Sequence, residues 1–355
     1  MNTKYLLPAI GLETLPFLQS SAPKADSIRF APSSEMAVAM EFSNSVEFFL
    51  EDFSAEAMGQ DMTEMVGDVE ASMNVDIDVE FTDTYREVDG GKPLAFTRTY
   101  GEGSINGEFT GAAQGESDTQ SFELMDGMDG HTIIFEWDAE EDEYVRSYPE
   151  DVEGDEEILQ NLSARVDLAF LLPEGEVSEG DEWEIDPAPL VEILIPGGDL
   201  NYDTPEGDRE SAAGGEQEMD EETLELLRQM MSGDATGTYK GMNDDGMAVI
   251  GVTLDLAGDT NLADMIADAM SNIPDADPSQ MPSFDDFTVD LALEGEGTLL
   301  WDPRAGHVVS FSMSAETEVS LSVAMGMEPQ PGMFMEMSGQ VSMGGTAEIE
   351  VEASH

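Results

Sequence analysis

The sequence predicts a mainly β protein of the α+β type, with one or more large antiparallel curved sheets, or half-barrels, and a few short helices. Apolar residues occupy odd positions almost without a break from 287 to 351, with Ser, Thr, Asp, Glu and Gln between them. Such period-two alternation is typical of strands with one apolar and one solvated face. Turn-forming sequences at 302–306 and 328–332 divide this stretch into three runs. The pattern therefore predicts a three-stranded antiparallel meander.

The N-terminal half repeats the same alternation. Residues 36–50 read as one bent strand or a hairpin, and 73–81 as a clear strand. An Asp-Gly-Gly turn at 89–91 leads into a further strand at 94–100. Residues 54–66, between the strands at 36–50 and 73–81, predict a short helix, because Ser54 is a suitable N-cap and the methionines that follow share one face.

A further hairpin and an acidic turn are predicted before the middle of the chain. Residues 119–125 and 131–137 flank the turn sequence 126–130, and an acidic turn at 138–143 leads into 144–148. The pairs Gly101/Gly103 and Gly295/Gly297 open no helix, so they indicate bulges or bends in strands.

The central part is less regular. Residues 156–164 favour a helix, and 171–185 a loop followed by a short strand. Residues 196–218 are rich in Gly, Asp, Glu and Pro and predict a loop or linker. Residues 219–231 give the strongest helix pattern in the chain, and Gly233 would end that helix.

The remaining elements lead into the meander. Residues 236–242 and 247–256 predict a hairpin around 243–246, and 262–270 predict a second helix. We therefore divide the chain into a possible leader (1–25), an N-terminal antiparallel β module (26–170), a connecting segment with an acidic loop and a helix (171–235), and a C-terminal antiparallel β module (236–355).

The charge of the chain limits its partners. Among 355 residues, 79 are Asp or Glu and 12 are Lys or Arg, which gives a net charge of −67. Binding to nucleic acid or to an anionic membrane surface needs a cationic surface, so both are disfavoured. Self-repulsion of this size needs screening by salt or divalent cations, which favours a saline or calcium-containing environment.

The N-terminus and the lack of cysteine bear on localisation. The N-terminus has the pattern of a secretory leader: Lys4 precedes an apolar stretch at 5–12, and small residues follow at Ala22 and Ala25. Glu13 interrupts the apolar part. The chain has no cysteine and no apolar run near the roughly 18–20 residues of a membrane-spanning helix. We expect an extracytoplasmic bacterial protein that is periplasmic, secreted or on the cell surface, with no transmembrane segment.

Acidic turns offer weak candidates for calcium, which prefers oxygen ligands. The candidates are Asp126, Asp129, Asp138, Asp142, Asp244 and Asp245, the last two next to Asn243. None of these clusters matches the EF-hand loop, and the alternative is that each is a solvated turn. We therefore name no cofactor, with calcium as the one ion considered.

No pattern in the sequence indicates catalysis. His131 and His307 each follow a turn glycine, His355 is terminal, and no histidine-rich metal motif, G-x-S-x-G, P-loop or Rossmann fingerprint is present. Paired carboxylates carry little information in a chain with 79 acidic residues. We expect a protein without enzymatic activity and assign no catalytic residue.

Methionine is the most suggestive residue type, with 24 copies. The candidate ligand-binding residues share the inward face of the predicted meander; they are Met313, Met325, Met333, Met335, Met337, Met343 and Trp301. Methionine is flexible and polarizable, which suits a surface that accepts varied apolar ligands. The alternative is that these side chains fill a sealed core, and the sequence leaves both open.

Three segments, 83–93, 172–185 and 297–306, resemble uncharacterised exported β-rich bacterial proteins that carry a Gly-Asp-x-Trp sequence in mid-chain. The last segment is also weakly similar to the half-barrels of bacterial lipoprotein-carrier and lipid-binding proteins. The resemblance implies a fold type and a cell-envelope setting, but no catalytic residues. The lipobox cysteine of the lipoprotein members is missing here.

Two functions follow as hypotheses. The first is a non-enzymatic protein that binds an apolar ligand or a protein partner on a methionine-lined sheet face. The second is a structural or surface-assembly protein whose acidic faces are bridged by divalent cations. The oligomeric state stays open.

Overall fold

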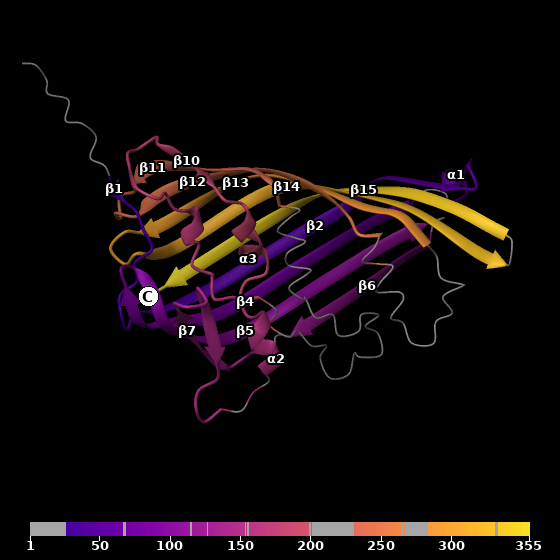
Figure 1. Cartoon of the computed structure of the whole chain (residues 1–355). Helices are drawn as coiled ribbons and strands as arrows, with labels where there is room; N and C mark the ends of the chain where they lie inside the picture. Colours follow the sequence, from indigo (N-terminus) through magenta and orange to yellow (C-terminus); the bar gives the residue numbers. More distant parts are fainter. Residues whose placement is uncertain are drawn as a thin grey trace, which may run out of the picture.

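The computed structural model describes residues 26–66, 69–113, 116–125, 127–152, 154, 156–198, 200, 231–263, 266, 283–330 and 333–355. Most of them belong to one antiparallel sheet of 13 strands, in the order β10-β11-β12-β13-β14-β15-β2-β4-β5-β7-β8, with β3 beside β2 and β6 beside β5. The sheet is curved and open (Figure 1). The predicted fold class is confirmed.

The C-terminal meander forms as predicted, with strands longer than the alternation alone required. Strands β13 (Ser283–Asp302), β14 (His307–Gln330) and β15 (Met333–Ser354) pair in sequence. The turn at 303–306 depends on Gly306, which has φ 68° and whose carbonyl accepts a hydrogen bond from Ala31 N at 2.9 Å. A side chain at Gly306 would collide with the backbone of Ala31, so glycine is required there on two grounds.

The N-terminal strands continue the same sheet. Strands β2 (Ala37–Ala57), β4 (Val69–Asp89) and β5 (Lys92–Ala113) form a second meander. Strand β15 pairs with β2 over most of its length, from Ala39 with Ser354 to Ala57 with Met337. The residues of the two expected β modules, 26–170 and 236–355, thus contribute strands to one continuous sheet.

The hairpin predicted for 119–137 is wrong. Strands β6 (Glu116–Met125) and β7 (Thr132–Asp138) do not pair with each other, because both pair with β5, one after the other. Strand β5 is long enough to carry two short strands along one edge. The glycine-rich stretch between them interrupts a strand and does not reverse it, and it places Met128, 1% exposed, in the core.

Shorter strands complete the edges. Strand β8 (Glu143–Ser147) pairs with β7 across the predicted acidic turn. Strands β11 (Gly233–Met242) and β12 (Ala248–Asn261) form the predicted hairpin at the other side, where β10 (Glu182–Ile185) is the last strand. Strands β3 (Gln60–Asp61), β1 (Asp26–Ser27) and β9 (Glu176–Val177) are two residues each, and β1 pairs with β9.

The named helices are short. They are α1 (Thr63–Val66), α2 (Glu156–Asn161), η1 (Ala169–Leu171), η2 (Ala188–Leu190) and α3 (Val191–Leu194). The helix expected to begin at Ser54 begins only at Thr63, because β2 continues through Ala57. The helix predicted at 219–231 and most of that at 262–270 lie outside the described residues.

Residues 156–198 and 200, apart from strand β10, which belongs to the sheet, are called the cover segment below and lie against one face of the sheet at the end where the C-terminus lies (Figure 1). The face of the sheet that the cover segment lies against, here called the inner face, is buried mainly at this end of the strands. Along β14, Phe311, Met313 and Thr317 are at most 6% exposed, whereas Val319 to Met325 on the same face are half-buried. The core therefore occupies one half of the strands, and the other half, the distal half, has a less covered apolar face.

Within the described part of the chain, no helix combines the length and the apolar character needed to cross a bilayer.

Candidate functional site

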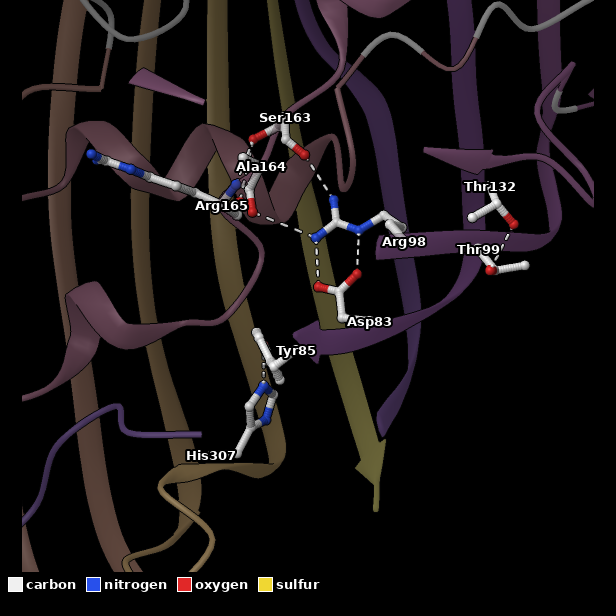
Figure 2. Close-up of polar contacts among 9 residues, drawn as sticks. All are labelled: Asp83, Tyr85, Arg98, Thr99, Thr132, Ser163, Ala164, Arg165 and His307. Carbon is white, nitrogen blue, oxygen red and sulfur yellow. Dashed lines mark hydrogen bonds and ion pairs between the residues drawn. The ribbon is translucent and has the colours of Figure 1, made fainter. Parts of the chain in front are cut away.

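The cover segment is attached to the sheet by a buried ion pair. Arg98 on β5 donates to Asp83 on β4 through two hydrogen bonds, Nε to Oδ1 at 2.7 Å and Nη2 to Oδ2 at 2.8 Å. Its Nη1 donates to the Ser163 carbonyl at 2.7 Å, and Nη2 lies 3.5 Å from that of Ala164 (Figure 2). Arg98 is fully buried and its guanidinium lies 4.2 Å from the ring centre of Phe81.

The charge of Arg98 is maintained despite its burial. Desolvation acts to lower its pKa, but the charge of Asp83 and the hydrogen bonds to it outweigh that effect, so the pKa is raised above the ordinary value. Arg98 is therefore a permanent cation that holds both a carboxylate and two backbone carbonyls.

Other side chains of the sheet donate to the cover segment in the same manner. Asn44 Nδ2 on β2 donates to the carbonyls of Ile193 and Leu194 at 2.8 and 3.1 Å. Arg146 on β8 and Trp183 on β10 donate to cover-segment carbonyls at 2.8 and 3.1 Å. Because these carbonyls are satisfied by side chains, an irregular segment can lie on the sheet without unpaired polar groups at these points.

A second buried polar pair lies between β4 and the start of β14. The hydroxyl of Tyr85 and Nε2 of His307 are 3.0 Å apart, and both residues are at most 2% exposed (Figure 2). Burial lowers the pKa of His307 to about 4, so the ring is neutral at neutral pH. Its Nδ1 faces the Val308 carbonyl at 3.4 Å, which leaves Nε2 to accept from Tyr85.

Between the cover segment and strands β2, β4, β5, β7 and β8 lies a cavity of about 500 Å³, here called the aromatic cavity. Its aromatic wall is formed by Phe30, Phe42, Tyr85, Phe96, Trp137, Tyr144 and Phe170. Residues 164–169, Pro189 and Ile193 of the cover segment close another side. The volume lies within the range of small-molecule sites, which are mostly apolar with a few polar groups.

The polar groups of the cavity wall are Asp83, Lys92, Arg165 and Asp167. Asp167 accepts a hydrogen bond from Ala169 N at 2.9 Å, and desolvation raises its pKa. Burial also raises the pKa of Tyr144 to about 12, and its hydroxyl donates to the Pro93 carbonyl at 2.7 Å. The Lys92 ammonium lies 2.9 Å from the ring centre of Trp137.

Backbone strain marks the cover side of the cavity. Leu168 has φ 56° and ψ 15°, in the left-handed region, although it is not glycine, and it is 1% exposed. Such a conformation costs on the order of 1 kcal/mol and persists where surrounding contacts determine it. Here it turns the chain between Asp167 and the turn η1, so that both line the same cavity.

The methionines chosen from the sequence separate into two groups. Met313 and Trp301 are 6% and 0% exposed and belong to the sealed core. The distal half carries the others on the same face, with Met325, Met335, Met337 and Met343 half-buried. Met325 and Met337 are cross-strand partners, while the side chain of Met333 lies outside the described set.

The acidic candidates are placed in turns. Asp138 Oδ1 accepts from Glu140 N at 2.7 Å, Asp142 closes the same turn with φ 60°, and Asp129 lies in the interruption between β6 and β7. Asp244 and Asp245 lie in the β11–β12 turn, where Asn243 Oδ1 accepts from two backbone N–H groups. Asp126 lies outside the described residues. Among those that are described, no group of three or more His, Asp or Glu residues is arranged to hold a metal ion.

The sequence interpretation missed the aromatic cavity. Its wall joins residues from β2, β4, β5, β7, β8 and the cover segment, and no local pattern connects these positions. One signal was available, since Arg98 interrupts an apolar face on β5 and a lone arginine there needs a buried partner.

Comparison of the chain with protein-family models and with curated proteins gives no match.

Proposed function

We propose that this protein is a non-enzymatic, extracytoplasmic binding protein that holds a small, mostly apolar ligand in the aromatic cavity. The observation that carries the proposal is the cavity itself, about 500 Å³ with seven aromatic residues in its wall. Burial of apolar and aromatic ligand surface against such rings is favourable.

The contacts of Asp83 and His307 favour binding over catalysis by these two groups. Asp83 is held by Arg98 through both carboxylate oxygens, and His307 is buried against Tyr85. Neither is placed to exchange a proton with a ligand, which general acid–base catalysis would require. The extracytoplasmic setting is supported by the charge of −67 and the lack of cysteine.

Titration with the neutral fluorescent probe N-phenyl-1-naphthylamine tests the proposal, with energy transfer from Trp137 as a second readout. Ala164→Phe places a ring into the cavity and should weaken binding by at least about tenfold. Ala169→Leu is a smaller replacement in the same wall and should give the same direction of change. Far-UV circular dichroism checks that each variant is folded.

A second candidate surface is the distal half of the sheet, favoured by the half-buried pair Met325 and Met337. Ala57 on β2 is the register partner of Met337. Ala57→Phe is therefore the matched control for Ala164→Phe. Loss of probe binding in Ala57→Phe alone would assign the ligand to the methionine-lined face, and unchanged binding in both variants would overturn the aromatic cavity as the site.

Assembly through acidic faces bridged by divalent cations stays a prediction that rests on the charge. Sedimentation with and without calcium would measure whether the protein assembles.

A further inference from the structure

The charges around the aromatic cavity do not cancel. Asp83 is paired with Arg98. Asp167 has Arg165 two residues away, and the charge of Arg165 acts to lower the pKa of that carboxylate, against desolvation. Asp83 is thus in an ion pair and the charge of Arg165 acts on Asp167 without an ion pair, whereas neither carboxylate of the wall is paired with Lys92. Arg98 is not itself in the wall, but counting it with Arg165 and Lys92 against Asp83 and Asp167 gives this site one excess positive charge, in a protein with a net charge of −67.

Lys92 is placed for contact with a ligand. It is the first residue of β5, is exposed, and lies over the face of Trp137, which itself lines the cavity. Asp89 is its register partner across the turn. The ion pairs among the described residues are Arg98 with Asp83 and Arg304 with Asp302, so no described carboxylate lies within ion-pair distance of Lys92.

We propose that the aromatic cavity takes a small apolar molecule with one negative group, a carboxylate or a sulfonate, and that Lys92 binds this group. The inference rests on the proposed function, because it names the ligand class for the same cavity. The apolar body lies among the rings, and the ammonium of Lys92, over the face of Trp137, donates to the acid group. A charge-assisted hydrogen bond of this kind is roughly twice as strong as a neutral one.

Because the protein as a whole is strongly negative, binding of an anion depends on the local positive charge of Lys92. An anion is repelled by most of the protein surface, so its binding depends on a site with the opposite sign. Salt shortens the range of the repulsion to about 3 Å at 1 M while a direct contact persists. High salt therefore isolates the contribution of Lys92.

A pair of probes that differ in one group tests the inference. 8-Anilinonaphthalene-1-sulfonate carries a sulfonate, and N-phenyl-1-naphthylamine is its neutral counterpart. Both are titrated against the full chain at about 1 M NaCl. The sulfonate should bind the wild type about tenfold more tightly than the neutral probe. Lys92→Gln should remove this ratio, and Lys92→Arg should keep it.

Lys240→Gln is the matched control, because Lys240 is exposed on β11, outside the cavity wall, and its loss changes the net charge equally. Its ratio should equal that of the wild type. If the neutral probe binds in the cavity but the sulfonate binds no more tightly, or if a naphthyl trimethylammonium binds more tightly than both, the inference is overturned and the proposed function stands. If neither naphthylamine probe binds, both fall.

Discussion

Replacing Arg98 by Met leaves Asp83 buried at 2% exposure without its counter-charge. Breaking a buried ion pair by removing one partner costs about 3–5 kcal/mol. The Ser163 carbonyl also loses its 2.7 Å donor, which adds about 1 kcal/mol. We therefore expect Arg98→Met to lower the free energy of unfolding by about 4–6 kcal/mol.

The assay is urea unfolding followed by tryptophan fluorescence and far-UV circular dichroism. A double variant, Arg98→Met with Asp83→Leu, replaces both charges by apolar groups and should recover much of the loss, because no uncompensated charge remains. Limited proteolysis of the cover segment should accelerate in the single variant, since Arg98 attaches that segment to the sheet.

A cost below about 1 kcal/mol for Arg98→Met would refute the reasoning, because exposed ion pairs have that value and the pair would then not be buried in solution. A double variant less stable than the single one would show that the hydrogen bonds to the cover segment, and not the ion pair, dominate.

Three further predictions concern stability. The unfolded His307 side chain gains its proton near pH 6.5 and the folded one only near pH 4, so wild type should lose about 3 kcal/mol relative to His307→Gln as pH falls through that interval. Gly345→Ala should cost more than about 2 kcal/mol in urea unfolding and Gly339→Ala less than about 1, because a methyl group collides with the β2 backbone at the first position and lies 3.2 Å from its nearest neighbour at the second. Met313→Ala should cost about 2–5 kcal/mol, and Met343→Ala markedly less, since only Met313 is fully covered.

Each has a contrary outcome. A pH-independent difference between wild type and His307→Gln would mean that the ring is accessible to protons when folded. Equal unfolding free energies for the two glycine variants would contradict the close approach of Gly345 to the β2 backbone. Equal losses of unfolding free energy for the two methionine variants would mean that the distal face is as tightly packed as the core.

Alternation was enough to predict most strands. The odd-numbered apolar positions of 287–351 defined three strands and their inner face, because a period of two has one structural solution. The pairing of neighbours along the chain was also predictable wherever a short turn joined them. The prediction failed at 119–137, because the same turn-forming residues occur where a strand reverses and where it is only interrupted. Here the pairing of both segments with β5 determines that the strand is interrupted.

The division of the inner face could not be predicted either. Met313 and Met343 have the same pattern in the sequence, yet only Met313 is fully covered. The cover segment lies at the end of the sheet where Met313 is buried, and it belongs to a part of the chain more than a hundred residues earlier, so no local pattern reveals the difference. The aromatic cavity escapes sequence reasoning for the same reason, since its wall is assembled by contacts between distant segments.

The pairing of β15 with β2 has a consequence for how the protein folds. Strands from opposite ends of the described chain meet in the middle of the sheet, so the contact order is high and closure of this seam must await synthesis of the last strand. On the outer surface, Glu80, Glu41 and Glu352 stand in one row across β4, β2 and β15. Like charges directly opposite one another oppose strand pairing, so dissolved salt would govern how fast the two meanders join.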